Sequence, residues 1–182
     1  RHNGHTRYLI HKDKYWKPAM SDVRKIYDEV FPSNFCMNEF QALAGSYLLN
    51  KIDQINSKRK TKWKIAENLL SKNKKIIMQK IPNNSLSSYH LLPLRLNINV
   101  NLIDNVFIQM ANKGIQCAKQ YQPLYRYHLF NENTDNLDSK KLLKNTDLFY
   151  DQMISVPFHE SLSVDDLTSI LRTLIDIVDK IK

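Results

Sequence analysis

Residues 38–70 carry the longest regular pattern in the chain, with apolar side chains recurring at intervals of three or four positions. This spacing places them along one face of an α-helix. Asn38 and Gln41 are spaced as in a helix-capping box, and Glu39 suits the positive end of the helix dipole. An unbroken helix of about 30 residues would extend roughly 45 Å. We therefore predict a long helix that bridges two bodies.

Beyond residue 70, short apolar runs are separated by turn residues and by helical patterns. Pro93 places the first of the longer runs at a sheet edge or a bulge, because proline cannot donate to a strand ladder. A further short apolar run extends from Ile76 to Met78. The expected strands are residues 88–96, 115–121 and 153–158.

Helical patterns alternate with these expected strands. Gly114 is placed to end one helix in the left-handed conformation, and Ser163 with Asp166 is placed to cap the last one. The two later helices can cover one face of a small, largely antiparallel sheet, which predicts an α+β fold. The expected helices are residues 101–113, 142–152 and 163–181, with a loop over residues 123–136.

The composition of the 182 residues, 42% hydrophobic and 25% charged, is that of a globular protein. Only 3 glycines are present, which leaves no room for a glycine-rich phosphate loop. The net charge of +9 favours an anionic partner such as a phosphorylated ligand, nucleic acid or a membrane surface. A lysine-rich solvated surface gives the same charge balance and is the simpler interpretation.

The cysteine count and the apolar runs bear on the compartment. Two cysteines without a C-x-x-C spacing argue against a disulfide framework and against a structural zinc site. No apolar run approaches the length of a membrane span, and the basic residues 1–13 lack the apolar segment of a signal peptide. We therefore expect a cytoplasmic protein that does not insert into a membrane.

Residues 34–45 read N-F-C-M-N-E-F-Q-A-L-A-G, and shorter motifs stand at residues 1–4 (R-H-N-G), 88–93 (S-Y-H-L-L-P), 121–124 (Y-Q-P-L) and 155–159 (S-V-P-F-H). They resemble the N-x-R-M-x-E-x-Q-A-A-x-G, R-x-H-G, S-Y-H-L-F-P, Y-x-P-L-H and S-L-P-L-H segments of the DegT/DnrJ/StrS family. Members of that family are pyridoxal-phosphate (PLP) aminotransferases that act on sugar nucleotides. The resemblance spans nearly the whole chain, but Cys36 replaces the Arg of the long motif and Tyr125 replaces a His.

The resemblance implies that this chain is the C-terminal part of an aminotransferase subunit of fold type I. Residues 1–37 would end the large PLP-binding domain, residues 38–70 would form a long interdomain helix, and residues 71–182 would form a small C-terminal α+β domain. The resemblance further implies a homodimer, PLP as the cofactor, a keto-sugar nucleotide as the substrate and an amino acid as the amino donor. A related PLP dehydratase is an alternative to the transaminase.

The same resemblance implies that the catalytic lysine lies elsewhere. The family's S-x-x-K segment, whose lysine forms the Schiff base with PLP, would precede Arg1, as would the Asp and the aromatic residue that hold the cofactor ring. We therefore assign no catalytic residue and no metal ligand to these 182 residues. We expect the isolated chain to have no transaminase activity.

Binding residues are implied at five positions. Asn34 matches the family's Asn that reaches the cofactor phosphate of the neighbouring subunit, and a helix entrance suits phosphate because it adds positive potential. Arg1, His2, His90 and Tyr121 are candidates for sugar-nucleotide contacts, since Arg and His suit a pyrophosphate and Tyr suits a uracil or sugar face. For each of these, the alternative is an ordinary surface or half-buried side chain, and for Asn34 a residue that caps the turn before the helix.

Two other functions fit parts of the sequence. The run K-R-K-T-K-W-K at residues 58–64 suggests a basic nucleic-acid-binding module, although on a helix these charges spread around the circumference. The small residues at the start of the predicted long helix, with Tyr47 and Leu48, suggest the interface of a non-catalytic relative that acts as a dimerising or regulatory partner. The small residues are Ala42, Ala44 and Gly45.

Overall fold

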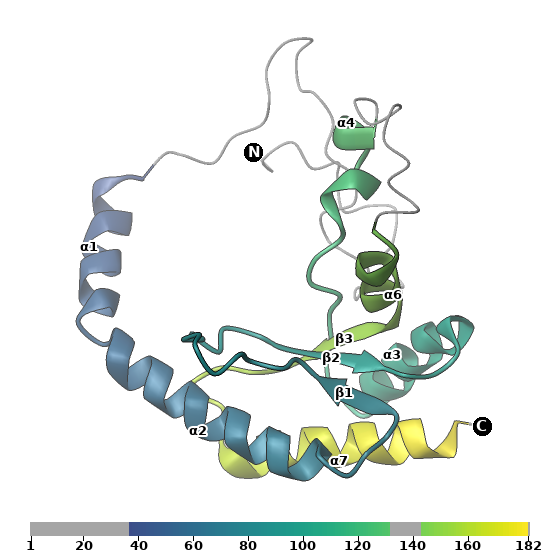
Figure 1. Ribbon diagram of the computed structural model, residues 1–182. Helices are drawn as coiled ribbons and strands as arrows, with labels where there is room; N and C mark the ends of the chain where they lie inside the picture. Colours follow the sequence, from purple (N-terminus) through teal and green to yellow (C-terminus); the bar gives the residue numbers. More distant parts are fainter. Residues whose placement is uncertain (1–36, 132–142, 182) are drawn as a thin grey trace.

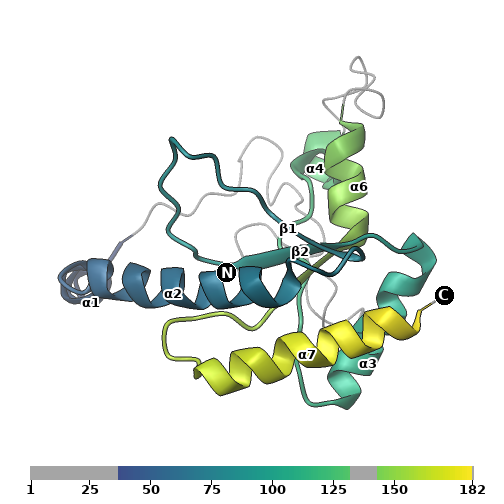
Figure 2. The ribbon, with the colours of Figure 1, turned by 60° about the horizontal axis from the view of Figure 1, so that its bottom comes forward.

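The computed structural model describes residues 37–131 and 143–181 of the chain. In chain order the elements are α1 (Glu39–Leu49), α2 (Ile52–Leu70), β1 (Ile76–Met78), β2 (Leu92–Leu96), η2 (Val100–Leu102), α3 (Ile103–Asn112), η3 (Leu124–Arg126), α4 (His128–Asn131), α6 (Lys144–Gln152), β3 (Met153–Val156) and α7 (Val164–Lys180). Three strands form one antiparallel sheet, and α2, α3 and α7 pack on one of its faces (Figures 1 and 2). The prediction of an α+β fold is confirmed.

Strand β2 lies between β1 and β3. Leu94 of β2 pairs with Met78 of β1 on one side and with Ile154 of β3 on the other. Pro93 stands one position beyond the end of β1, so at that point β2 is paired only with β3. The edge position predicted for this strand is therefore wrong, because β2 is central; Pro93 is tolerated because β1 does not extend to it, so its missing N–H leaves no ladder bond to β1 unmade.

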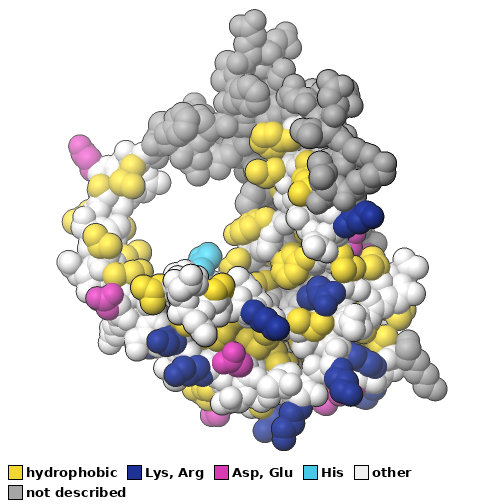
Figure 3. Space-filling view, viewed as in Figure 1, with side chains coloured by type: hydrophobic (Ala, Val, Ile, Leu, Met, Phe, Trp, Pro, Cys, Tyr) yellow, Lys and Arg dark blue, Asp and Glu magenta, His cyan; other side chains and the backbone are white. Residues whose placement is uncertain are grey.

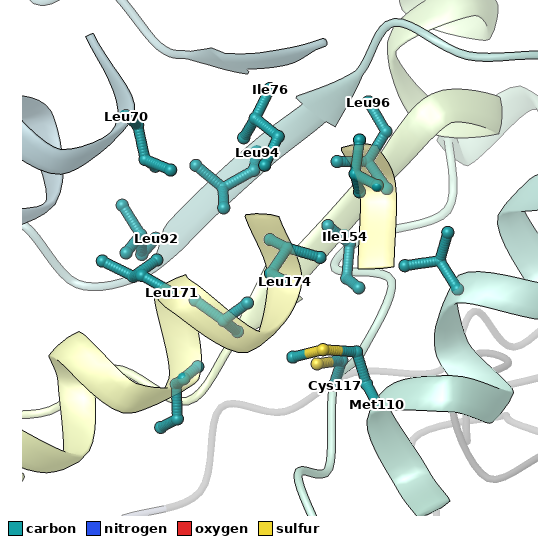
Figure 4. Close-up of a cluster of buried hydrophobic side chains, with 14 of the residues drawn as sticks. Leu70, Ile76, Leu92, Leu94, Leu96, Met110, Cys117, Ile154, Leu171 and Leu174 are labelled. Atoms are coloured by element: carbon teal, nitrogen blue, oxygen red, sulfur yellow. The ribbon is translucent and has the colours of Figure 1, made fainter. Parts of the chain in front are cut away.

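Alternate residues of β2 point to opposite faces of the sheet. Leu92, Leu94 and Leu96 are fully buried, whereas Pro93 and Arg95 are half-buried on the other face. Figure 4 shows the leucines of β2 among side chains of α7. The apolar stripe of α7 contributes six buried residues to this core, namely Leu167, Ile170, Leu171, Leu174, Ile177 and Val178.

Both ends of α7 are held by polar contacts. At its start the Ser163 side chain accepts a hydrogen bond from the Asp166 N–H, as the sequence predicts. At its end Lys75 Nζ donates to the carbonyl oxygen of Ile181 at 2.6 Å and to that of Val178 at 3.3 Å. A cation at the C-terminal end of a helix satisfies unpaired carbonyls and complements the helix dipole.

The predicted long helix is two helices that meet at Asn50 and Lys51. The Lys51 backbone N–H bonds to the Leu48 carbonyl, three residues back, so the regular α-helical ladder is interrupted there. The capping box that the sequence predicts at Asn38 and Gln41 is present. The α1 helix, in contrast to α2, buries no residue and projects beyond the body of the molecule in Figure 1.

Two strand predictions need correction. The strand expected over residues 88–96 begins only at Leu92, because Tyr89 has a φ of 50°, which breaks the extended conformation. Residues 115–121 do not form a strand. Only Ala118 pairs in that segment, exchanging two backbone hydrogen bonds with Ser155, after which the chain turns toward α6. Gly114 has a φ of 75°, which confirms the predicted left-handed end of α3.

The loop expected over residues 123–136 contains two short helices in its described part, η3 and α4. The helix expected at 142–152 is present as α6. None of the helices in residues 37–131 and 143–181 combines the length and the hydrophobicity that crossing a bilayer requires.

Candidate functional site

The structure places two of the five predicted binding residues, His90 and Tyr121. Arg1, His2 and Asn34 lie outside the described residues, so their roles stay predictions. His90 is exposed in the connection that leads into β2, and Tyr121 is 59% exposed in the segment that precedes η3. The two side chains therefore stand on different connections, both accessible to a ligand.

A cavity of about 480 Å³ lies on the sheet face that the core helices leave open. Arg95 is the charged residue among its described lining, and Arg95 Nη1 donates to Gln152 Oε1 at 3.2 Å. Gln152 is buried and in turn donates to the Ile98 carbonyl at 3.0 Å, which fixes its orientation. The lining joins four parts of the chain and consists of Ile77, Met78, Gln79, Pro93, Arg95, Gln120 and Phe149.

This cavity combines mostly apolar walls with one cation, a combination suited to a flat or apolar group that carries an acceptor oxygen. Tyr121 directly follows the lining residue Gln120 in the sequence but is not itself among the described lining residues. His90 is not among the described lining residues.

Next to the cavity, Arg126 binds two carboxylates one helical turn apart on α6. Arg126 Nε donates to Asp147 Oδ1 at 2.8 Å, and Nη1 donates to Asp151 Oδ1 at 2.7 Å. Arg126 Nη2 bonds to both carboxylates as well. We call Arg126, Asp147 and Asp151 the Arg126 clamp. Paired hydrogen bonds between a guanidinium and a carboxylate are among the strong, geometrically specific ones in proteins.

Tyrosines and a lysine surround the Arg126 clamp. The Tyr125 hydroxyl donates to Asp147 Oδ1 at 2.9 Å, and the Arg126 guanidinium carbon lies 5.1 Å from the centre of the Tyr150 ring. Lys119 Nζ donates to the Asp151 carbonyl at 3.3 Å. The hydrogen bond to Asp151 raises the pKa of Arg126, and burial raises the pKa of Tyr150 to about 12. Arg126 therefore keeps its positive charge, and Tyr150 keeps its proton, near neutral pH.

A second polar junction ties α2 to the loop after β3. Arg59 Nη2 lies 2.8 Å from Glu160 Oε2, and Lys62 Nζ donates to the Glu160 carbonyl at 2.7 Å. The pKa of Glu160 is lowered by a hydrogen bond from its own backbone and next by Arg59. Two members of the basic run thus turn toward the protein, so the run does not present one continuous basic surface for nucleic acid.

The described residues do not by themselves fit PLP. A lysine that forms a Schiff base needs a free amine in a pocket. The least exposed lysines of the described part, Lys62, Lys75 and Lys119, instead donate to backbone carbonyl oxygens. No three His, Cys, Asp or Glu side chains among residues 37–131 and 143–181 come together as metal ligands.

The Arg126 clamp is the feature that the sequence analysis missed. Its signal is weak, since the two aspartates share a face of a helix only if residues 142–152 are helical, and Arg126 lies 21 and 25 residues away from them. The spacing of Asp147 and Asp151 by four positions on a predicted helix, after a loop that holds an arginine, could have suggested it.

The sequence model of the DegT/DnrJ/EryC1/StrS aminotransferase family matches residues 11–175 of the chain. A UDP-4-amino-4,6-dideoxy-N-acetyl-beta-L-altrosamine transaminase of Campylobacter jejuni is 25% identical over 150 residues, which cover 82% of this chain and 39% of that enzyme. The enzyme of the same name from Helicobacter pylori is 24% identical over 150 residues, with the same coverage. The chain thus spans about two fifths of the length of the curated relatives that it matches.

Solved structures of sugar aminotransferases have a similar fold. PseC of Helicobacter pylori, an aminotransferase involved in the biosynthesis of pseudoaminic acid, matches with a TM-score of 0.66 and 21% identity over 86% of this chain and 42% of PseC. A Streptococcus pneumoniae protein assigned as a sugar aminotransferase, in its PLP form, matches with a TM-score of 0.70 and 22% identity. That match covers 85% of this chain and 39% of the other. At these identities the likeness shows the fold.

Proposed function

Because the chain belongs to the DegT/DnrJ/EryC1/StrS aminotransferase family, we propose that it is the C-terminal region of a PLP-dependent aminotransferase acting on keto-sugar nucleotides. The observation that carries the proposal is the family match over residues 11–175. The relatives from Campylobacter jejuni and Helicobacter pylori are named as transaminases of a UDP-linked amino sugar, which supports the substrate class. Cytoplasmic location, homodimerisation and an amino-acid donor belong to the same proposal.

In this proposal residues 1–37 end the large domain, residues 38–70 connect the two domains and residues 71–182 form the small domain. The described residues supply a surface on the open face of the sheet, and PLP is held mainly by parts of the protein outside them. Asn34 would contact the cofactor phosphate, while Arg1 and His2 would contact the sugar nucleotide.

The described contribution to substrate binding comes from the surface beside Tyr121. A ring such as uracil or a sugar can stack on an exposed tyrosine. The cavity lined by its sequence neighbour Gln120 adds apolar walls and the Arg95 guanidinium, which suit a polar group on the same ligand. His90, also exposed, would add a hydrogen-bond donor toward a pyrophosphate from a different connection.

The α1 helix supports the proposal that this chain is one part of a larger assembly. Its large apolar side chains, among them Phe40, Leu43 and Tyr47, are exposed, and Figure 3 shows hydrophobic side chains gathered over it. An 11-residue helix with this composition is stable when other surfaces cover it. We assign that cover to the large domain and to the second subunit of the dimer.

The test is an assay of amino transfer in a longer protein that carries this segment together with a PLP-binding lysine domain. With a UDP-linked 4-keto sugar and glutamate, the longer protein should release 2-oxoglutarate, and the isolated 182-residue chain should release none. Activity of the isolated chain would contradict the proposal. Consumption of the keto sugar without 2-oxoglutarate would favour the PLP dehydratase instead.

A further inference from the structure

The segment from Lys119 to Arg126 is attached to α6 at both of its ends. Lys119 Nζ donates to the Asp151 carbonyl at one end, and Arg126 binds the carboxylates of Asp147 and Asp151 at the other. Between these attachments the side chain of Tyr121 is 59% exposed. The segment is therefore a loop with an exposed tyrosine whose two ends are attached to the same helix.

Helix α6 has a fixed position because it runs directly into the sheet. Its last residue, Gln152, is followed by Met153, the first residue of β3, and both side chains are buried. Tyr150 of α6 is also buried. Contacts to α6 therefore fix the position of the loop that carries Tyr121 relative to the sheet.

The attachment of the loop to α6 also affects the width of the cavity. Phe149 of α6 and Gln120 of the loop are both lining residues, and the Arg126 clamp holds the loop against α6. If the clamp opens, Lys119 still attaches the start of the loop to α6, but the part of the loop that follows it, with Tyr121, loses its second attachment. A lysine at position 126 keeps the charge but cannot bridge two carboxylates with planar, paired donors.

We infer that Arg126 is a positioning residue that fixes to α6 the loop carrying Tyr121 and the lining residue Gln120, and so determines the affinity for the ligand that binds there. The identity of that ligand, a nucleotide sugar, rests on the proposed function. The role of Arg126 in fixing the loop to α6 is independent of the proposed function.

The experiment uses the 182-residue chain and UDP-N-acetylglucosamine as the probe, with dissociation constants from an NMR titration. Tyr121→Ala and Arg126→Ala should each weaken binding by about tenfold, the effect of losing one aromatic contact. The double variant should bind no more weakly than either single variant, because both changes remove the same contact. Arg126→Lys should recover part of the affinity, and Arg172→Ala, at an exposed arginine of α7, should change nothing.

Amide hydrogen exchange tests the loop itself. The N–H groups of Arg126 and Tyr127 bond to the carbonyls of Pro123 and Leu124, and in Arg126→Ala they should exchange about tenfold faster than in the unmodified chain. The Ser155 N–H, which bonds to Ala118, should exchange as before and serves as the internal control.

The outcomes separate the two proposals. Additive losses in the double variant, or unchanged exchange at positions 126 and 127 in Arg126→Ala, would overturn the positioning role. If the unmodified chain does not bind the probe while the exchange result holds, the positioning role of Arg126 in the loop stands and the nucleotide-sugar ligand is contradicted.

Discussion

Helices α1 and α7 are both capped by a side chain and both rich in apolar residues, yet they use these residues differently. The α7 helix places them on one stripe and buries six of them, while α1 buries none. In α1 only Glu39, Gln41 and Ser46 have fully polar side chains, so apolar groups surround most of its circumference. The comparison shows that the described residues bury α7 in their own core, whereas the apolar surface of α1 is available to pack against surfaces beyond the described residues.

The largest expected difference is in the cost of truncating a leucine in each region. Leu94→Ala empties space in the middle of the closed core and should lower the free energy of unfolding by about 2–5 kcal/mol. Leu43→Ala in α1 is the matched control and should change it by less than about 0.5 kcal/mol. Urea unfolding with an unchanged m-value measures both. Equal losses at the two sites would show that α1 folds as part of the core.

A second difference concerns stability at alkaline pH, because the titratable groups with raised pKa values lie in the core region around α7 and α6, not in α1. Burial raises the pKa of Cys117 from 9.0 to about 12, and burial followed by the nearby Tyr127 raises that of Tyr150 from 10.0 to about 12. Above pH 9 the unfolded chain loses the thiol proton and the folded chain keeps it, so stability must fall as pH rises.

The expected slope from Cys117 alone is up to about 1.4 kcal/mol per pH unit between the two pKa values. Urea unfolding at a series of pH values from neutral to alkaline measures it. In Cys117→Ala the curve should fall less steeply above pH 9, whatever the variant does to stability at neutral pH. A slope that Cys117→Ala leaves unaltered would mean that the thiol is open to solvent in the folded chain.

The helix caps offer a smaller, closely matched test. Ser163 accepts a hydrogen bond from the Asp166 N–H, and Ser163→Ala should cost about 1 kcal/mol because α7 is part of the core. Asn38 accepts the equivalent bond from the Gln41 N–H at 2.9 Å. Asn38→Ala should melt α1 locally without a measurable change in the midpoint of global unfolding. Thermal unfolding followed at the aromatic near-ultraviolet signal distinguishes the two results.

The smallest effect on stability is expected at the exposed face of α1. Phe40→Ser removes an apolar side chain that touches no core residue and should change the free energy of unfolding by less than about 0.5 kcal/mol. The same substitution should weaken self-association, measured by sedimentation over a range of concentrations, because it removes contact area. Unaltered self-association of Phe40→Ser would exclude α1 from a dimer interface.

Features that depend on near neighbours were predictable from the sequence. The caps at Asn38 and Ser163 and the left-handed Gly114 follow from residues within a few positions, and the structure has all three. The interruption at Lys51 was not predicted, because the apolar spacing continues in phase across it. The strand expected at 115–121 fails because a single residue, Ala118, finds a partner.

The candidate site divides in the same way. Motif resemblance pointed to Tyr121 and His90, neither of which is among the described lining residues of the cavity, although Gln120, the neighbour of Tyr121 in the sequence, is. The Arg126 clamp was beyond sequence reasoning because it joins residues 21 and 25 positions apart, across a loop whose path the sequence does not specify. Residues close together in the sequence determine where helices and strands begin and end. Ion pairs between distant residues determine how the loops pack against them.

The order of strands in the sheet has a consequence for synthesis on the ribosome. Strand β2 is central, but its second neighbour, β3, is made about sixty residues later, and α7 follows β3. A growing chain therefore exposes the leucines of β2 until β3 and α7 have left the ribosome. We expect a nascent chain stopped before α7 to need a chaperone to stay soluble.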